Sequence, residues 1–100
     1  MKELKGSQKK YLRGLAHNLN PAAVIGQKGI TETLIKEIDQ ALEACELIKV
    51  KFNDFKEKDQ KNSLISEIAK ATQSHIAGMI GHVGILYRQN SDVEKRVINL

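Results

Sequence analysis

The 100-residue chain has little of what cross-linked, metal-binding and aromatic-rich proteins use. Its one cysteine, Cys45, can form no internal disulfide and cannot by itself build a zinc site. Tryptophan is absent, and the two tyrosines and two phenylalanines form no cluster of the kind on which RRM domains stack bases. A chain of this length has room for one small domain, so nearly every apolar stripe must enter a single core.

Long apolar segments are also missing. The longest uncharged run, residues 71–87, contains two histidines and three glycines and falls short of the roughly 20 apolar residues of a membrane helix. The first ten residues have no apolar core like that of a signal peptide. We therefore expect a single domain over residues 1–100, located in the cytoplasm and without a membrane partner.

Signatures of nucleotide-using and metal enzymes do not occur in the sequence. There is neither a GxxxxGK[ST] phosphate loop nor a GxGxxG dinucleotide fingerprint. The three histidines lack metal-ligand spacing, and we interpret His75 and His82 as strand-end or surface residues. Cys45 falls on the apolar stripe of a predicted helix, which favours packing over nucleophilic chemistry. We expect no enzymatic activity, cofactor, metal or small-molecule substrate.

Positive charge is concentrated at the start of the chain. The net charge is +4, and the first 17 residues hold five basic residues against Glu3 while the rest of the chain is balanced. Such a segment favours a polyanionic partner, and the alternative is a solvated helix face with surplus lysine. Its apolar side lacks Trp and Phe, which disfavours a membrane surface. The basic residues are Lys2, Lys5, Lys9, Lys10 and Arg13.

The spacing of apolar residues predicts alternating helices and strands. Helices are expected over residues 7–19, from about 31 to 45, and from about 59 or 63 to 72. Strands are expected over residues 22–25, 47–52, 76–88 and 95–100. Strands joined through helices imply right-handed crossovers and a partly parallel sheet. The order α-β-α-β-α-β-β predicts an α/β two-layer sandwich, with three helices on a mixed four-stranded sheet.

The two sides of the first predicted helix differ in character. Its apolar side is expected to dock on the sheet and to leave the basic side facing outward. The apolar residues at helical spacing are Tyr11, Leu12, Leu15, Ala16 and Leu19. In the last part of the chain, Gly78, Gly81 and Gly84 indicate bends, a bulge or the close approach of another backbone.

A glycine loop carries the most specific functional signal. The sequence Gly26-Gln27-Lys28-Gly29 lies between a predicted strand and a helix for which Thr31 is a plausible N-cap. Helix N-termini suit phosphate, and GxxG loops clamp the nucleic-acid backbone in KH domains. The alternative is an ordinary structural turn. Our hypothesis is that the amides of residues 29–31, together with Lys28, hold a phosphate.

Four segments, taken in order, resemble the CRM domain family (chloroplast RNA splicing and ribosome maturation) in its single-domain bacterial, YhbY-like form. The resemblance covers essentially the whole chain. Its segments are residues 12–17, residues 24–31 (VIGQKGIT), residues 47–51 (LIKVK), and Ile80-Gly81-His82 with the following Leu86-Tyr87-Arg88. One position departs from the expected pattern, because Gly84 stands where a bulkier strand residue is expected.

This resemblance implies a fold similar to the C-terminal domain of bacterial translation initiation factor three. It also implies RNA binding, with ribosomal RNA of precursor large subunits as the partner of bacterial members. The implied contacts are the basic helix from Lys2 to Arg13, the loop residues Gly26, Gln27, Lys28 and Gly29, and Arg88, whose role is equally compatible with structure. Two alternatives stay open: a protein-interaction module that docks an acidic or ribosomal-protein partner through the basic helix, and an enzyme that uses the loop as a phosphate site.

Overall fold

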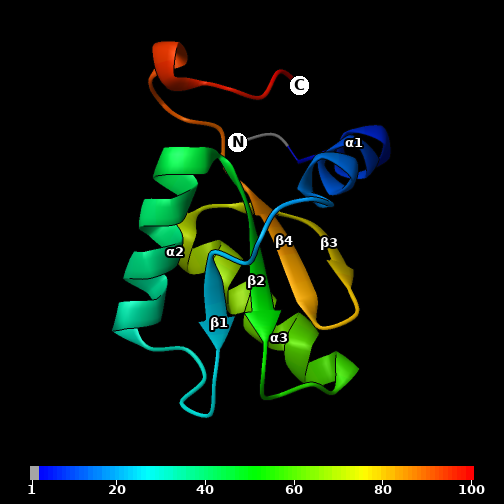
Figure 1. Cartoon of the computed structure of the whole chain (residues 1–100), viewed down its shortest axis with the longest axis vertical. Helices are drawn as coiled ribbons and strands as arrows, with labels where there is room; N and C mark the ends of the chain where they lie inside the picture. Colours follow the sequence, from blue (N-terminus) through cyan, green and yellow to red (C-terminus); the bar gives the residue numbers. More distant parts are fainter. Residues whose placement is uncertain (1–2) are drawn as a thin grey trace.

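The computed structural model describes residues 3–100, which fold around one four-stranded sheet (Figure 1). Three α-helices, four strands and one 3-10 helix follow one another along the described chain. Their bounds are α1 Gly6–Ala16, β1 Ala23–Ile25, α2 Glu32–Cys45, β2 Leu47–Phe52, α3 Lys58–Thr72, β3 His75–Ile80, β4 Val83–Tyr87 and η1 Val93–Lys95. No helix within residues 3–100 is both long and apolar enough to cross a membrane.

The sheet has the strand order β1-β2-β4-β3. β1 runs parallel to β2, and the other two pairings are antiparallel, so the predicted mixed sheet with three helices is confirmed. α2 and α3 cover one face, whereas α1 crosses the opposite face near the two chain ends (Figure 1). α1 therefore adds a partial third layer.

Each face of the sheet has its own apolar core. The larger core joins α2 and α3 to residues of β1, β2 and β4, with Phe52 and Ile38 fully buried in it. The smaller core lies under α1, where Leu12 and Ala16 belong to one buried cluster with Ile85 and Tyr87 of β4. Alternation along β2 divides its side chains between the two faces.

The single long strand predicted over residues 76–88 is wrong. It is a hairpin, in which β3 and β4 pair antiparallel and Gly81 and His82 form the turn between Ile80 and Val83. Gly81 has φ +57°, a conformation that glycine adopts without steric cost. The bulge suggested by the glycines is present in β3, between Ile76 and Gly78.

The strand predicted over residues 95–100 is also wrong. After η1 the chain has no regular structure, and its amides bond to a side chain instead of to a neighbouring strand. Glu46, which is 1% exposed, accepts hydrogen bonds from the amides of Asn90 (2.6 Å), Val97 (2.7 Å) and Ile98 (3.0 Å). This buried carboxylate supplies the acceptors that a neighbouring strand would have supplied.

Two expectations about apolar side chains also need correction. α1 ends at Ala16 rather than at residue 19, and only Leu12 and Ala16 of its apolar side are buried. Tyr11, Leu15 and Leu19 are exposed, because the narrow contact with the sheet accepts one row of the helix. Cys45, expected in the core, is exposed at the end of α2. The four exposed residues Tyr11, Leu15, Leu19 and Cys45 line an apolar groove of about 370 Å³ between α1 and the C-terminal tail.

The departure at Gly84 has a packing explanation. A Cβ at this position would lie 2.8 Å from Ile65 Cδ1, which is too close for a real contact. Ile65 comes from α3 and is 2% exposed. The helix side chain therefore occupies the space that a bulkier strand residue would have filled.

Candidate functional site

The GxxG loop forms a closed turn at the carboxyl end of β1. The amide of Gly29 donates to the carbonyl of Gly26 over 3.0 Å, and Gly29 has φ +66°. Thr31 caps α2, as predicted, with its Oγ1 accepting from the amide of Leu34 at 3.1 Å. The two glycines therefore turn the chain sharply, and the loop leads directly into the N-terminus of α2.

Lys28 is exposed at the tip of this turn. The loop borders a pocket of about 410 Å³, which Val24, Glu37 and the loop residues line. The amide of Gly29, one of the three expected to hold a phosphate, already donates to the carbonyl of Gly26 within the turn. Among residues 3–100, none accepts a hydrogen bond from the amides of Ile30 and Thr31. Those two amides and the positive end of the α2 dipole are what the loop offers to an anion.

A second loop supports the first. Asn53 and Asp54, which follow β2, both donate their amides to the carbonyl of Ile25 (3.0 and 3.3 Å). The ring of Phe55 then lies beside Gly29, where an added Cβ would be 3.5 Å from the ring. This contact fixes the loop against the end of the sheet.

The β3–β4 turn is held at the same end of the sheet. Lys61 of α3 is only 9% exposed, and its Nζ donates to the carbonyl of Gly81 over 2.6 Å. The same Nζ lies 3.3 Å from His82 Nδ1. Partial desolvation, together with the charges of Lys61 and Lys56, lowers the pKa of His82 below its usual range. The lysines around this turn therefore disfavour a positive charge on the His82 ring.

The basic residues predicted on α1 differ in their freedom. Lys5 and Lys10 are exposed and Lys9 is half-buried, whereas Lys2 lies outside the described residues. Arg13 is half-buried, and its Nη1 donates to the carbonyl of Ala77 in β3 over 3.0 Å. A Cβ at Gly78 would lie 2.7 Å from Arg13 Cδ, so the glycine leaves the room in which the arginine crosses the strand.

α1 and the GxxG loop do not lie side by side. α1 packs on β2, β3 and β4 near the chain ends, and the loop lies at the opposite end of the sheet (Figure 1). A single compact basic surface formed by helix and loop would require that they be neighbours. The structure instead presents two basic elements with part of the sheet between them.

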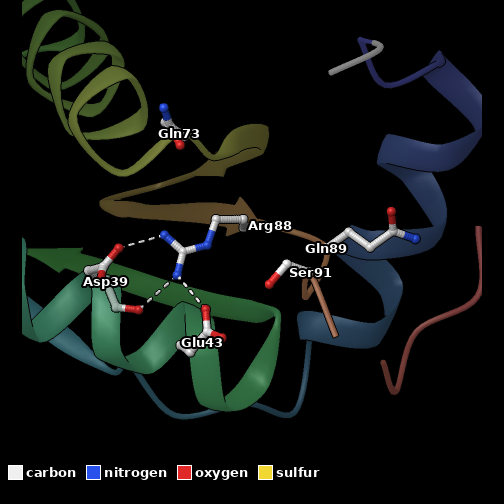
Figure 2. A pocket seen from close by; sticks show the side chains of 6 residues that line it. All are labelled: Asp39, Glu43, Gln73, Arg88, Gln89 and Ser91. Atoms are coloured by element: carbon white, nitrogen blue, oxygen red, sulfur yellow. Dashed lines mark hydrogen bonds and ion pairs between the residues drawn. The ribbon is translucent and has the colours of Figure 1, made fainter. Parts of the chain in front are cut away.

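Arg88 is engaged within the protein. Its guanidinium reaches α2, where it forms ion pairs with Asp39 (2.6 Å) and Glu43 (3.2 Å), as Figure 2 shows. It also donates to the carbonyls of Thr72 (2.8 Å) and Asp39 (3.1 Å). The side chain is 16% exposed. This geometry joins β4 to α2 and α3, which fits the structural alternative for Arg88.

The acidic residues are distributed unevenly over the fold. Residues 4–31, 47–53 and 68–91 contain no Asp or Glu, and these ranges include α1 and all four strands. Lys49 and Lys51 lie in β2 and face the α1 side, because Val50 and Phe52 face α2 and α3. Neither lysine was among the predicted site residues. The alternation of apolar and basic residues in 47–52 was the signal that marked them.

Comparisons with known proteins agree with one another. The sequence model of the CRS1 / YhbY (CRM) domain matches residues 4–88. A Haemophilus influenzae protein named as an RNA-binding protein is 38% identical over 94 residues, which cover 94% of each chain. A Bacillus subtilis protein named as a probable RNA-binding protein is 38% identical over 89% of this chain and 92% of its own.

A solved structure shows the same fold. The solution structure of a Staphylococcus aureus protein, described as a candidate RNA-binding protein, superimposes with a TM-score of 0.81 at 40% identity. The match covers 96% of this chain and 99% of the other.

Proposed function

Because the chain belongs to the CRS1/YhbY (CRM) domain family, we propose that it binds RNA through the GxxG loop and the basic residues of α1. The proposal extends to ribosomal RNA in precursors of the large ribosomal subunit. Relatives that cover nearly the whole chain are named as RNA-binding proteins. The ribosomal part is supported by the resemblance to single-domain bacterial members.

The observation that carries the proposal is the geometry of the loop. A turn closed by Gly29 delivers the amides of Ile30 and Thr31 to the N-terminus of α2, with Lys28 exposed beside them. Backbone amides bind a phosphate without reading its base, so the loop anchors a backbone rather than a sequence. The lysines of α1 then contact phosphates elsewhere on the same RNA, because helix and loop lie at opposite ends of the sheet.

Variants of the loop test the proposal. We expect Lys28→Ala to weaken binding and to lower the slope of log affinity against log salt by about 0.7–0.9, the value for one lost phosphate contact. Gly29→Asp should weaken binding further, because it puts a negative charge where the phosphate is held. Anisotropy with a labelled fragment of large-subunit ribosomal RNA, and with duplex DNA of equal length, measures both changes.

Gly29→Asn is the matched control for charge. Asparagine tolerates positive φ about as well as aspartate, and the space beside Phe55 admits a Cβ. Its RNA affinity should therefore stay close to that of the wild type. Lys36→Ala, an exposed lysine of α2 outside the loop, controls for the loss of net charge. Unchanged RNA affinity in a folded Gly29→Asp protein would refute the role of the loop.

One observation favours a second function, the docking of a protein. The exposed apolar side of α1 and the adjoining groove, with Tyr11 51%, Leu15 41% and Leu19 40% exposed, lie beside the basic residues of the helix. Equal, weak binding to RNA and DNA in the same experiment would favour this function. Tighter RNA binding that depends on the loop would favour the first.

A further inference from the structure

Resting on the proposed function, we propose that an uncovered row of the sheet is a third part of the RNA surface and joins the loop to α1. The row consists of four residues: Val24, Lys51, Val83 and Ile80. It crosses all four strands on the α1 side of the sheet.

The strand pairing places these residues in one line. Val24 is the register partner of Lys51, Lys51 pairs with Val83, and Val83 pairs with Ile80. Neighbouring strands lie about 4.8 Å apart, so the row extends over about 14 Å. A line of this kind is fixed by backbone pairing and needs no rearrangement before a ligand meets it.

All four side chains face the same way. Ala23 and Ile25 on either side of Val24, and Val50 and Phe52 on either side of Lys51, belong to the core under α2 and α3. In β4, Gly84 faces Ile65 of α3. Because side chains alternate along a strand, the residues between these positions point to the α1 side.

α1 leaves this row open. It covers the next two rows on the same face, toward the chain ends, where Ile85 is 1% and Tyr87 is 3% exposed. In the open row, Val24 is 47% and Ile80 is 58% exposed, and Lys51 is exposed as well. Val83, between Lys51 and Ile80 in the row, is half-buried. Two exposed aliphatic residues in line with a half-buried one, on a part of the sheet that no helix covers, indicate a contact surface rather than chance exposure.

The charge around the row indicates what kind of partner binds there. None of the four strands contains an acidic residue, and Lys28 follows β1 at the end of the sheet nearest the row. On the α1 side of the row, Lys49 Nζ donates to the carbonyl of His17 over 3.0 Å, which holds its charge where α1 ends. Lys49 and Lys51 therefore continue the positive charge from α1 toward the loop, and a polyanion is the complementary partner.

The composition of the row defines how RNA is held. Lys51 contacts a phosphate, and the methyl groups of Val24, Val83 and Ile80 contact ribose and base edges. The row carries no aromatic ring, so bases do not stack on it as they do on RRM sheets. Binding of this kind combines a salt-dependent part from Lys51 with a salt-independent part from the aliphatic residues.

Two variants separate those parts, measured with the same labelled ribosomal RNA fragment. Lys51→Gln should lower affinity about three- to fivefold at 0.15 M salt and reduce the salt slope by about 0.7–0.9. Ile80→Ser should lower affinity about three- to tenfold with an unchanged slope, because it removes apolar contact and no charge.

Each variant has a matched control. Lys36→Gln removes an exposed lysine on α2, and Val93→Ser removes an aliphatic residue, 69% exposed, in η1 of the C-terminal tail. Neither control should change affinity by more than about twofold. Circular dichroism and thermal unfolding of all four proteins establish that they are folded.

The outcomes distinguish this inference from the function on which it rests. If Lys28→Ala weakens RNA binding while Lys51→Gln and Ile80→Ser behave like their controls, the row is not part of the surface and the loop proposal stands. If Lys28→Ala and Gly29→Asp have no effect, or RNA binds no better than DNA, the proposed function fails and the row fails with it. Losses in both row variants with silent controls support the inference.

Discussion

On one face of the sheet, α2 and α3 form a core with residues of β1, β2 and β4, against which β3 also packs, whereas on the other face α1 covers only the part near the chain ends. The acidic residues follow the same division. The helices α2 and α3 carry half of them, and α1 and the strands carry none.

The two faces of this small sheet therefore have different roles: one stabilises the fold, and the other suits the binding of a partner. Phe52 and Lys51 are neighbours in β2, yet Phe52 is fully buried under the helices while Lys51 is exposed on the other side. The covered face contributes most of the apolar burial that a domain of this size needs. On the partly open face, neither the strands nor α1 carries an acidic residue, which suits contact with a polyanion.

The largest effect, a loss of stability, is expected from a change at Glu46, on the α1 side of the sheet. This carboxylate holds the C-terminal tail, so Ile98 reaches the core under α1. Glu46→Gln places an amide N–H₂ opposite backbone N–H donors and leaves a buried donor unpaired, which should cost about 3 kcal/mol of unfolding free energy. Urea unfolding measures the loss, with the exposed Glu37→Gln as control.

The pH dependence sharpens the test at Glu46. Burial alone would raise the pKa of Glu46, but the amides of Asn90, Val97 and Ile98 and the charge of Arg96 outweigh it and lower the pKa below 4.5. The carboxylate therefore stabilises the fold fully above pH 4.5, and this contribution is lost as pH falls through the lower, folded-state value. The stability difference between wild type and E46Q should shrink below pH 4.5, and a difference independent of pH would contradict the account.

A smaller effect is expected from two glycines on opposite faces. Gly84→Ala pushes a methyl group toward Ile65, which is confined in the larger core, and should cost about 2 kcal/mol. Gly78→Ala instead meets Arg13, a flexible and half-exposed side chain that can move aside. We expect little loss of stability there and a weaker affinity for RNA.

Thermal unfolding and RNA anisotropy on both glycine variants check this contrast. Arg13→Gln provides the reference for a lost guanidinium, and Gly78→Ala should approach its affinity without adding to it in the double variant. Equal destabilisation by the two alanines would show that the two faces tolerate crowding alike and would contradict the difference between them.

Much of the fold was predictable because its local patterns are unambiguous. The 47–52 strand was predicted with its observed bounds, and Thr31 was recognised as the cap of α2. The errors arose where a distant partner decides the structure. The alternating residues 95–100 resemble a strand, but their amides bond to Glu46, about 50 residues earlier. The hairpin was missed because its two-residue turn, Gly81-His82, lies within a run of mostly apolar residues.

Some parts of the candidate site could be predicted from the sequence in more detail than others. The GxxG loop follows from its glycines and its place before a helix. The amide of Gly29, however, closes the turn, a detail set by its positive φ. The polar side of the 47–52 strand was visible in its alternation. That this side meets α1, and that α1 stops short of Lys51, depends on tertiary packing that no local pattern contains.

The most direct test is an amide NMR titration of the ¹⁵N-labelled full chain with the ribosomal RNA fragment. We expect shifts at the loop residues 26–31, at Lys51, Val83 and Ile80, and along α1, with α2 beyond its first turn and the outer side of α3 unaffected. Shifts concentrated on the outer sides of α2 and α3, with the loop and the open row silent, would contradict this expectation.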